Sequence, residues 1–188
     1  MPRAPRSAPP AEIRPARPED LPALARLGAK LARMHHAMDP LRFFLPEEPI
    51  EEGYAWWLGK ELRNRRAIVL AAERRGRIIG YGYGRMEPRD WNSLRDACGV
   101  GVDPWVEPAA RRGGLGGRLA DALTAALEAR GADRVVLGVA TRNPGAQRLF
   151  RSVGFRPTMV EMARERRAAA APPNEGRPRR RRKRTLGG

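Results

Sequence analysis

The chain has 188 residues, of which 41% are hydrophobic, enough for one domain with a sizeable buried core. Its single cysteine, Cys98, excludes an internal disulfide and a cysteine-rich metal site, so we expect a reducing compartment and no metal. No apolar run approaches the roughly 20 residues that span a bilayer, and residues 1–10 lack the apolar core of a signal peptide. We therefore expect a cytoplasmic protein that does not associate with membranes.

The formal net charge of +16 is unevenly distributed along the chain. Residues 164–188 carry ten basic and two acidic side chains, a net charge of +8, and have almost nothing to bury. The sequence therefore predicts one folded domain over residues 12–165, between disordered extensions at 1–11 and 166–188. Such an arginine-rich tail can contact nucleic acid weakly by counterion release, although a solvated tail without a function has the same composition.

The first third of the chain is expected to hold one short strand and two helices. Residues 13–16 read as the strand, and leucines then recur at helical spacing over 21–34. Asp39-Pro40 should end this helix, because proline disfavours helical backbone in the residue before it. A second helix is predicted across 50–62.

Strands dominate the middle of the chain. Segments 67–72 and 78–83 flank Arg75-Gly76, an arrangement typical of a β-hairpin. The next strand is expected over 97–106, where Pro104 cannot donate a hydrogen bond to a neighbouring strand. A bulge or a splay is therefore predicted around this proline.

A glycine-rich turn joins the strand end at Trp105-Val106 to a helix predicted over 115–129. Glycines let the backbone approach a ligand closely, and the amides of a first helical turn have no partner inside the helix. Together with the positive end of the helix dipole, these amides attract an anion such as a pyrophosphate. The residues of this predicted anion site are Arg111, Arg112, Gly113, Gly114, Leu115, Gly116 and Gly117.

Two common phosphate-binding motifs do not fit this turn. A Walker loop would carry Lys and then Ser or Thr where this sequence has Gly117 and Arg118. The spacing Gly114-x-Gly116 lacks the third glycine of a Rossmann fingerprint, and the unit follows a predicted hairpin. The sequence therefore argues against a magnesium-nucleotide site and against a dinucleotide site.

A second motif follows a fifth strand that is predicted over 134–141. Asn143 is a good helix N-cap, and Pro144 stands at the first helical position. Gly154 suits the left-handed backbone with which many helices end. These features predict a short helix between Asn143 and Gly154.

Both motifs resemble those of the GNAT superfamily of N-acetyltransferases. Arg111-x-x-Gly114-x-Gly116 is similar to the acetyl-coenzyme A motif of that superfamily. The segment from Asn143 to Phe155 looks like its later N-x-x-A-x-x-L-[YF]-x-x-x-G-F motif, and the resemblance covers residues 13–164.

This resemblance implies an α/β fold: a single GNAT-like domain with a mixed, mostly antiparallel sheet, helices on both faces, and splayed fourth and fifth strands. The pantetheine arm of acetyl-coenzyme A would lie in the splay, and the Val106 backbone would polarise the thioester carbonyl. Besides the anion site, the expected cofactor-binding residues are Trp105, Val106, Asn143, Leu149 and Phe150.

The resemblance also implies transfer of an acetyl group from acetyl-coenzyme A to a primary amine, by direct attack in a ternary complex. A base must take the proton of the amine, and Asp103 is the first candidate because it lies three residues before Val106. Glu107 and Glu87 are weaker candidates. Cys98 precedes the functional end of its strand, so we expect no covalent enzyme intermediate on it.

Phe150 departs from the pattern of many superfamily members, which carry a tyrosine whose hydroxyl protonates the leaving thiolate. Solvent can protonate the thiolate instead, and Tyr81 or Tyr83 can do so as well. A third interpretation is a catalytically idle acyl-coenzyme A sensor. The basic tail offers one more alternative, a nucleic-acid-associated protein that uses the folded part as a scaffold.

The acceptor is expected to be an amine of a small molecule or a peptide. His35 and His36 point about 100° apart on a helix and cannot easily share a metal, but one of them can line an acceptor pocket. The aromatic residues expected beside that histidine are Phe43, Phe44, Trp56 and Trp57. The sequence has no symmetric signature, so both a monomer and a homodimer are open.

Overall fold

In the computed structural model of the chain, residues 9–46, 49–101 and 104–165 are described. The chain divides into two compact units, residues 1–158 and 159–188. The first unit holds all helices and strands of the described residues. Most of the two predicted extensions, residues 1–8 and 166–188, lies outside the described residues, and so does Asp103.

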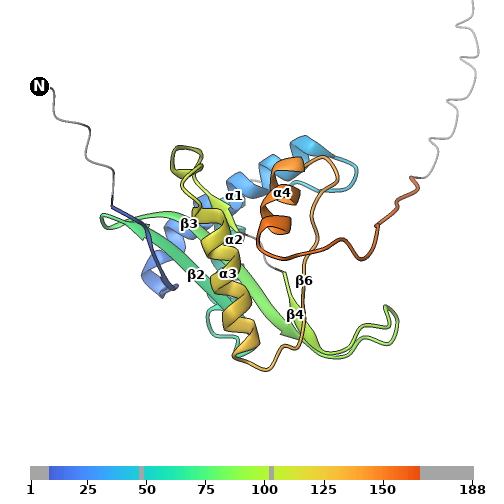
Figure 1. The fold of residues 1–188 in the computed structure, drawn as a ribbon. Helices are drawn as coiled ribbons and strands as arrows, with labels where there is room; N and C mark the ends of the chain where they lie inside the picture. The colour runs from blue at the N-terminus through green and yellow to red at the C-terminus, as the bar shows by residue number, and fades with distance from the viewer. Residues whose placement is uncertain (1–8, 47–48, 102–103, 166–188) are drawn as a thin grey trace, which may run out of the picture. The chain divides into compact units, whose positions relative to one another are not determined.

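One mixed sheet forms the centre of the first unit (Figure 1). Its strands are β1 (Glu12–Pro15), β2 (Ala67–Arg74), β3 (Arg77–Glu87), β4 (Cys98–Val100), β5 (Trp105–Val106) and β6 (Val135–Val136). They follow the order β1-β2-β3-β4-β6, and β5 also pairs with β3. β4 and β6 are parallel and all other pairs are antiparallel, which confirms the predicted mixed and mostly antiparallel sheet.

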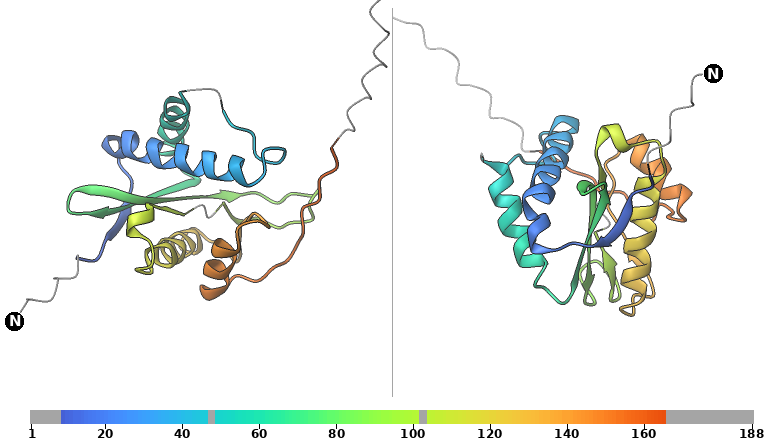
Figure 2. Two further views of the ribbon diagram at one scale, coloured as in Figure 1. Left: turned by 90° about the horizontal axis from the view of Figure 1, so that it is seen from above. Right: turned by 90° about the vertical axis from the view of Figure 1, so that its left-hand side faces the viewer.

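Helices cover both faces of this sheet, as predicted (Figure 2). α1 (Leu21–Met38) and α2 (Ile50–Glu61) lie on one face, and α3 (Leu115–Glu128) and α4 (Pro144–Ser152) lie on the other. Two short 3₁₀ helices precede α1 and α3, at Pro18–Asp20 and Pro108–Ala110.

The strand β2 is apolar on both sides because it lies between two cores. Successive strand residues point to opposite faces of a sheet. Val69 and Ala71 pack under α1 and α2, whereas Ile68 and Leu70 pack under α3. The continuous apolar run of this segment therefore marks a strand that is buried on both faces.

The predicted hairpin forms at Arg75 and Gly76. Both residues have positive φ angles, 53° and 72°, as the two central residues of a type I′ turn require. Glycine adopts this conformation freely, and its presence at position 76 explains why the turn falls between β2 and β3.

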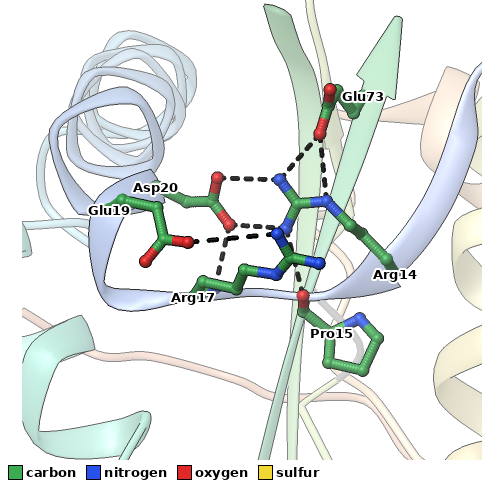
Figure 3. Close-up of polar contacts among 6 residues, drawn as sticks. All are labelled: Arg14, Pro15, Arg17, Glu19, Asp20 and Glu73. Carbon is green, nitrogen blue, oxygen red and sulfur yellow. Dashed lines mark hydrogen bonds and ion pairs between the residues drawn. The ribbon is translucent and has the colours of Figure 1, made fainter. Parts of the chain in front are cut away.

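An ion-pair network ties β1 to β2 and to the start of α1 (Figure 3). Arg14 donates to both carboxylate oxygens of Asp20, at 2.7 and 2.9 Å, and to Glu73 at 2.7 Å. Asp20 also accepts a hydrogen bond from the amide of Arg17 at 2.8 Å. The hydrogen bonds from Arg14 hold the pKa of the buried Asp20 carboxyl below its usual range, so this carboxylate stays charged.

The strand predicted over 97–106 is interrupted. Val100 lies opposite Arg85 and Trp105 lies opposite Tyr81, so five steps along this segment face four steps along β3. The additional residue between β4 and β5 is the hallmark of a bulge, and Pro104 lies in the interruption. The structure thus agrees with the irregularity predicted around Pro104.

The fifth strand is shorter than predicted. Of residues 134–141 only Val135 and Val136 form a strand, which pairs with β4 and not with β5. The chain then leaves the sheet, since no residue from 137 to 141 has a strand partner. Among the described residues, β3 is therefore the only strand that pairs with β5, and β5 and β6 are splayed.

Candidate active site

The turn before α3 presents unpaired backbone amides. Gly114 has the left-handed angles φ 69° and ψ 2° and stands at the N-cap of α3. The first helical hydrogen bond of this turn runs from the Arg118 amide to the Gly114 carbonyl at 3.1 Å. The amides of residues 115–117 therefore have no acceptor within the helix, and no acidic side chain lies in the first turn to neutralise its positive end.

Helix α4 packs closely against this turn. A Cβ atom at Gly116 would lie 2.7 Å from Cδ1 of Leu149, so the absence of a side chain there lets the two helices approach. Phe150 is buried in the core and meets the Phe155 ring edge to face, with ring centroids 5.8 Å apart. Leu149 thus lies beside the predicted anion site, while Phe150 contributes to the packing under α3.

The backbone of Val106 faces the splay. Glu107 donates from its amide to the Ile79 carbonyl at 2.9 Å, and Trp105 is the strand partner of Tyr81. In an antiparallel ladder, residues bonded to the partner strand alternate with residues whose amide and carbonyl point the other way. The amide and carbonyl of Val106 therefore point away from β3, toward the edge of β5 that is not paired with β6.

Arg111 folds back over this strand end. Its Nε donates to the Val106 carbonyl at 2.9 Å, and its guanidinium lies 4.8 Å from the centroid of the Trp105 ring. Arg112 is exposed and has a positive φ of 69°. The two arginines of the predicted anion site thus differ: one is attached to the strand, and the other is free to meet an anion from solvent.

One carboxylate lies on the opposite face of β5. Because side chains alternate along a strand, Val106 points toward α3, while Trp105 and Glu107 point toward α1. Glu107 is only 18% exposed, and its Oε1 lies 2.6 Å from Nζ of Lys30 on α1. The contact between Lys30 and Glu107 could not be predicted from the sequence, because a lysine on an amphipathic helix normally faces solvent.

The other predicted carboxylates lie elsewhere or outside the described residues. Glu87 is paired with Cys98 at the far end of β3, and it lies seven positions along the strand from Gly80, the partner of Val106. At about 3.3 Å per residue this places it roughly 23 Å along the strand from the splay. Asp103 lies outside the described residues.

The two tyrosines proposed as acids lie beneath α1 and α2. Tyr81 is buried, with 1% of its surface exposed. Tyr83 donates from its hydroxyl to Glu61 at 2.7 Å, and burial together with this carboxylate raises its pKa above the ordinary value. The hydroxyl of Tyr83 is therefore a weak acid that is already engaged.

Asn143 caps α4, as predicted. Its Oδ1 accepts a hydrogen bond from the Ala146 amide at 3.1 Å. Gln147 donates to the carbonyl oxygens of Ala140 and Thr141, at 3.1 and 3.0 Å, and so fixes the segment that leaves the sheet. Arg142 attaches the same segment to the end of α1 through the Met38 carbonyl, at 2.7 Å. The roles of Gln147 and Arg142 were not predicted, because they depend on contacts that only the fold creates.

A pocket of about 180 Å³ lies between the end of α1 and the start of α2. The ring of His35 stacks on Phe43, with centroids 4.9 Å apart, and Phe44 also lines the pocket. Trp57 instead packs on Tyr83, and Trp56 is exposed beneath Lys60. The pocket thus contains His35 and half of the predicted aromatic set.

No group of three or more His, Cys, Asp or Glu side chains among the described residues is arranged to hold a metal ion. Within the same residues, no helix is long and apolar enough to cross a bilayer.

Comparison with known proteins identifies the family. The model of the acetyltransferase (GNAT) family matches residues 31–155, two thirds of the chain. The chain belongs to the GNAT acetyltransferase family. A curated relative, mycothiol acetyltransferase of Thermobispora bispora, is 28% identical over 186 residues, a match that covers 76% of this chain and 62% of the relative.

Solved structures show the same fold. A mutant of the BH1408 protein of Bacillus halodurans matches with a TM-score of 0.68 and 22% identity, over 82% of this chain and 98% of the other. A predicted acetyltransferase of Clostridium acetobutylicum, solved with acetyl-CoA, matches with a TM-score of 0.63 and 17% identity, over 81% and 96% of the two chains. These likenesses confirm the GNAT-like α/β architecture.

Proposed function

We propose that the protein transfers an acetyl group from acetyl-coenzyme A to a primary amine, by direct attack in a ternary complex. The main support is the proximity in sequence of two backbone features: the outward-facing amide of Val106 and the unpaired amides of residues 115–117. The Val106 amide can donate a hydrogen bond to a thioester carbonyl, and the amides of residues 115–117 can donate to a pyrophosphate. Coenzyme A carries both groups on one molecule.

The residues that would hold the donor act mainly through their backbone. Residues 113–117 would bind the pyrophosphate, with Arg112 adding charge. The Val106 amide would donate to the thioester carbonyl as negative charge develops on its oxygen, a kind of contact worth roughly 10²- to 10³-fold in rate. Leu149 would line the path of the pantetheine, and Asn143 and Phe150 stay predicted contacts.

A carboxylate on the α1 face of β5 is suited to accept the proton of the attacking amine. Glu107 is the carboxylate next to Val106 among the described residues, and it lies on the face opposite to α3. The amine would then approach from the α1 face and the donor from the splay, so that the reacting atoms meet at β5. Asp103 remains the first candidate from the sequence. Mutation of Asp103 and of Glu107 one at a time would distinguish which carboxylate acts as the base.

Protonation of the leaving thiolate is assigned to solvent. Phe150 has no hydroxyl, and Tyr83 is engaged by Glu61. A coenzyme A thiolate is a fair leaving group, and general acid catalysis contributes only about 10²- to 10⁴-fold, so turnover does not require an enzyme acid.

The proposal is tested by titrating coenzyme A into the full chain in a calorimeter and by following thiol release with a panel of primary amines. We expect binding in the micromolar range and release that depends on the amine. Absence of binding at high micromolar coenzyme A would refute the assignment. Binding without release across the panel would favour the acyl-coenzyme A sensor.

Several predictions from the sequence stay proposals. These are the cytoplasmic location, an amine acceptor on a small molecule or a peptide, a monomer or homodimer, and a weak nucleic-acid contact through the tail. The relative from Thermobispora bispora is named as a mycothiol acetyltransferase, and we therefore include a thiol-bearing amine in the amine panel.

A further inference from the structure

We propose that Lys30 occupies the position of the acceptor's ammonium group at Glu107 and thereby limits which amines bind. This inference rests on the proposed function and deepens it, because it assigns a place to the acceptor amine and a specificity-determining role to a residue of α1. It starts from one contact, the 2.6 Å pair between Lys30 Nζ and Glu107 Oε1.

The two partners differ in their freedom to move. Glu107 directly follows β5, its amide is bonded to Ile79, and its side chain is only 18% exposed. The Lys30 side chain is 48% exposed at the end of a flexible stem. The ammonium of Lys30 can therefore move into solvent, whereas the Glu107 carboxylate keeps its place and is left for another cation to neutralise.

The carboxylate has few other partners. Among the described residues, Lys30 is the only side chain that hydrogen-bonds to Glu107. The nearest arginine in sequence, Arg111, is engaged by the Val106 carbonyl and the Trp105 ring. Arg33, one turn along α1, pairs with Glu51. Within the described part of the chain, a carboxylate next to the proposed thioester position is thus neutralised by a single, half-exposed primary ammonium.

A protonated acceptor amine carries the same group as the Lys30 side chain. If the acceptor meets Glu107, it must displace Lys30, and the two ammonium groups compete for one carboxylate. A primary amine therefore binds Glu107 less tightly in the native protein than it would without Lys30. Loss of a merely structural ion pair would have the opposite effect, because a loosened β5 would weaken binding.

The test measures amine binding at equilibrium and does not depend on turnover. Tyramine and neamine are titrated calorimetrically into the full chain, with and without saturating coenzyme A. Lys30→Met is compared with the native protein and with Lys60→Met, which removes an equal charge from a lysine that lies over Trp56. We expect Lys30→Met to lower the Kd of at least one amine by about three- to fivefold, and Lys60→Met to change it less than twofold.

Glu107→Gln in the Lys30→Met background should abolish this gain. An unchanged or raised Kd in Lys30→Met, an equal gain in Lys60→Met, or binding of neither amine to Lys30→Met would overturn the inference. Thermal unfolding of each variant checks that the fold is kept. Absence of coenzyme A binding to the native chain would instead count against the proposed function, and the amine titrations without coenzyme A would still decide the role of Lys30.

Discussion

Arg111 donates a hydrogen bond from Nε to the carbonyl oxygen of Val106 at 2.9 Å, and the same guanidinium covers the Trp105 ring. The first residue of the anion motif is thus attached to the strand end that would hold the thioester. Arg111 connects the two halves of the proposed donor site, the backbone of β5 and the turn before α3.

Replacement of Arg111 should therefore weaken coenzyme A binding by more than the loss of a positive charge explains. We expect Arg111→Lys to keep most of the electrostatic attraction but to lose the planar stacking and the Nε hydrogen bond, and to weaken coenzyme A binding by about tenfold. Arg112→Lys is the matched control, and it should change the Kd by less than about threefold because Arg112, unlike Arg111, makes no hydrogen bond or ring contact with the described residues. Equal effects at the two positions would show that only charge matters.

Gly114 is the glycine of the turn that has a left-handed backbone, which disfavours a side chain. Its φ of 69° costs a non-glycine residue about 1–2 kcal/mol, so Gly114→Ala should destabilise the start of α3 by that amount and weaken coenzyme A binding. A Cβ at Gly113 would meet no atom within 4 Å, and Gly113 has no positive φ. Gly113→Ala should accordingly stay within about 0.5 kcal/mol in urea unfolding. An unchanged free energy of unfolding in Gly114→Ala would contradict the left-handed backbone assigned to this residue.

Tyr83 should be dispensable for the chemistry. Burial and Glu61 raise its pKa, which makes its phenol a poorer acid for a departing thiolate. We expect Tyr83→Phe to keep kcat within about twofold while costing roughly 1 kcal/mol of stability for the lost hydrogen bond. A drop in kcat of a hundredfold, with the Tm little changed, would instead identify Tyr83 as the acid.

Local signals were sufficient to predict most of the fold. Arg75-Gly76 between two apolar runs specified the hairpin, and Asn143-Pro144 specified the start of α4, because both depend on backbone conformations set by neighbouring residues. The fifth strand was overestimated because apolar character continues through Val139, whereas pairing ends at Val136, since its partner β4 ends at Val100 and β5 does not pair with β6. Strand length depends on a partner, and residues 134–141 do not encode that partner locally.

The site was predicted less completely than the fold. The turn before α3 could be predicted because helix termini and glycines have local rules. Lys30 and Arg142 could not, since each acts through a contact with a residue 77 or 104 positions away. Arg111 was predicted as an anion ligand from its place in the motif, but its side-chain direction depends on the packing of Trp105.

The Arg14, Asp20 and Glu73 network provides a stability test that is independent of function (Figure 3). Asp20 is buried and paired, so Asp20→Asn should cost about 3 kcal/mol at pH 7, because it leaves part of the Arg14 charge uncompensated. Glu19→Gln is the control: its pair with Arg17 spans 4.0 Å with both side chains more than half exposed, and its loss should be barely measurable.

The same pair should make stability depend on pH in a defined direction. The folded-state pKa of Asp20 is lowered, so its contribution is fully present above the unfolded-state pKa of about 3.9 and is lost as the pH falls through the folded-state value. The stability difference between the native protein and Asp20→Asn should therefore be constant from pH 7 to about pH 5 and shrink below about pH 4. Urea unfolding of both proteins across this pH range measures the difference in their free energies of unfolding. A difference that grows on acidification would show that another group supplies the stabilisation.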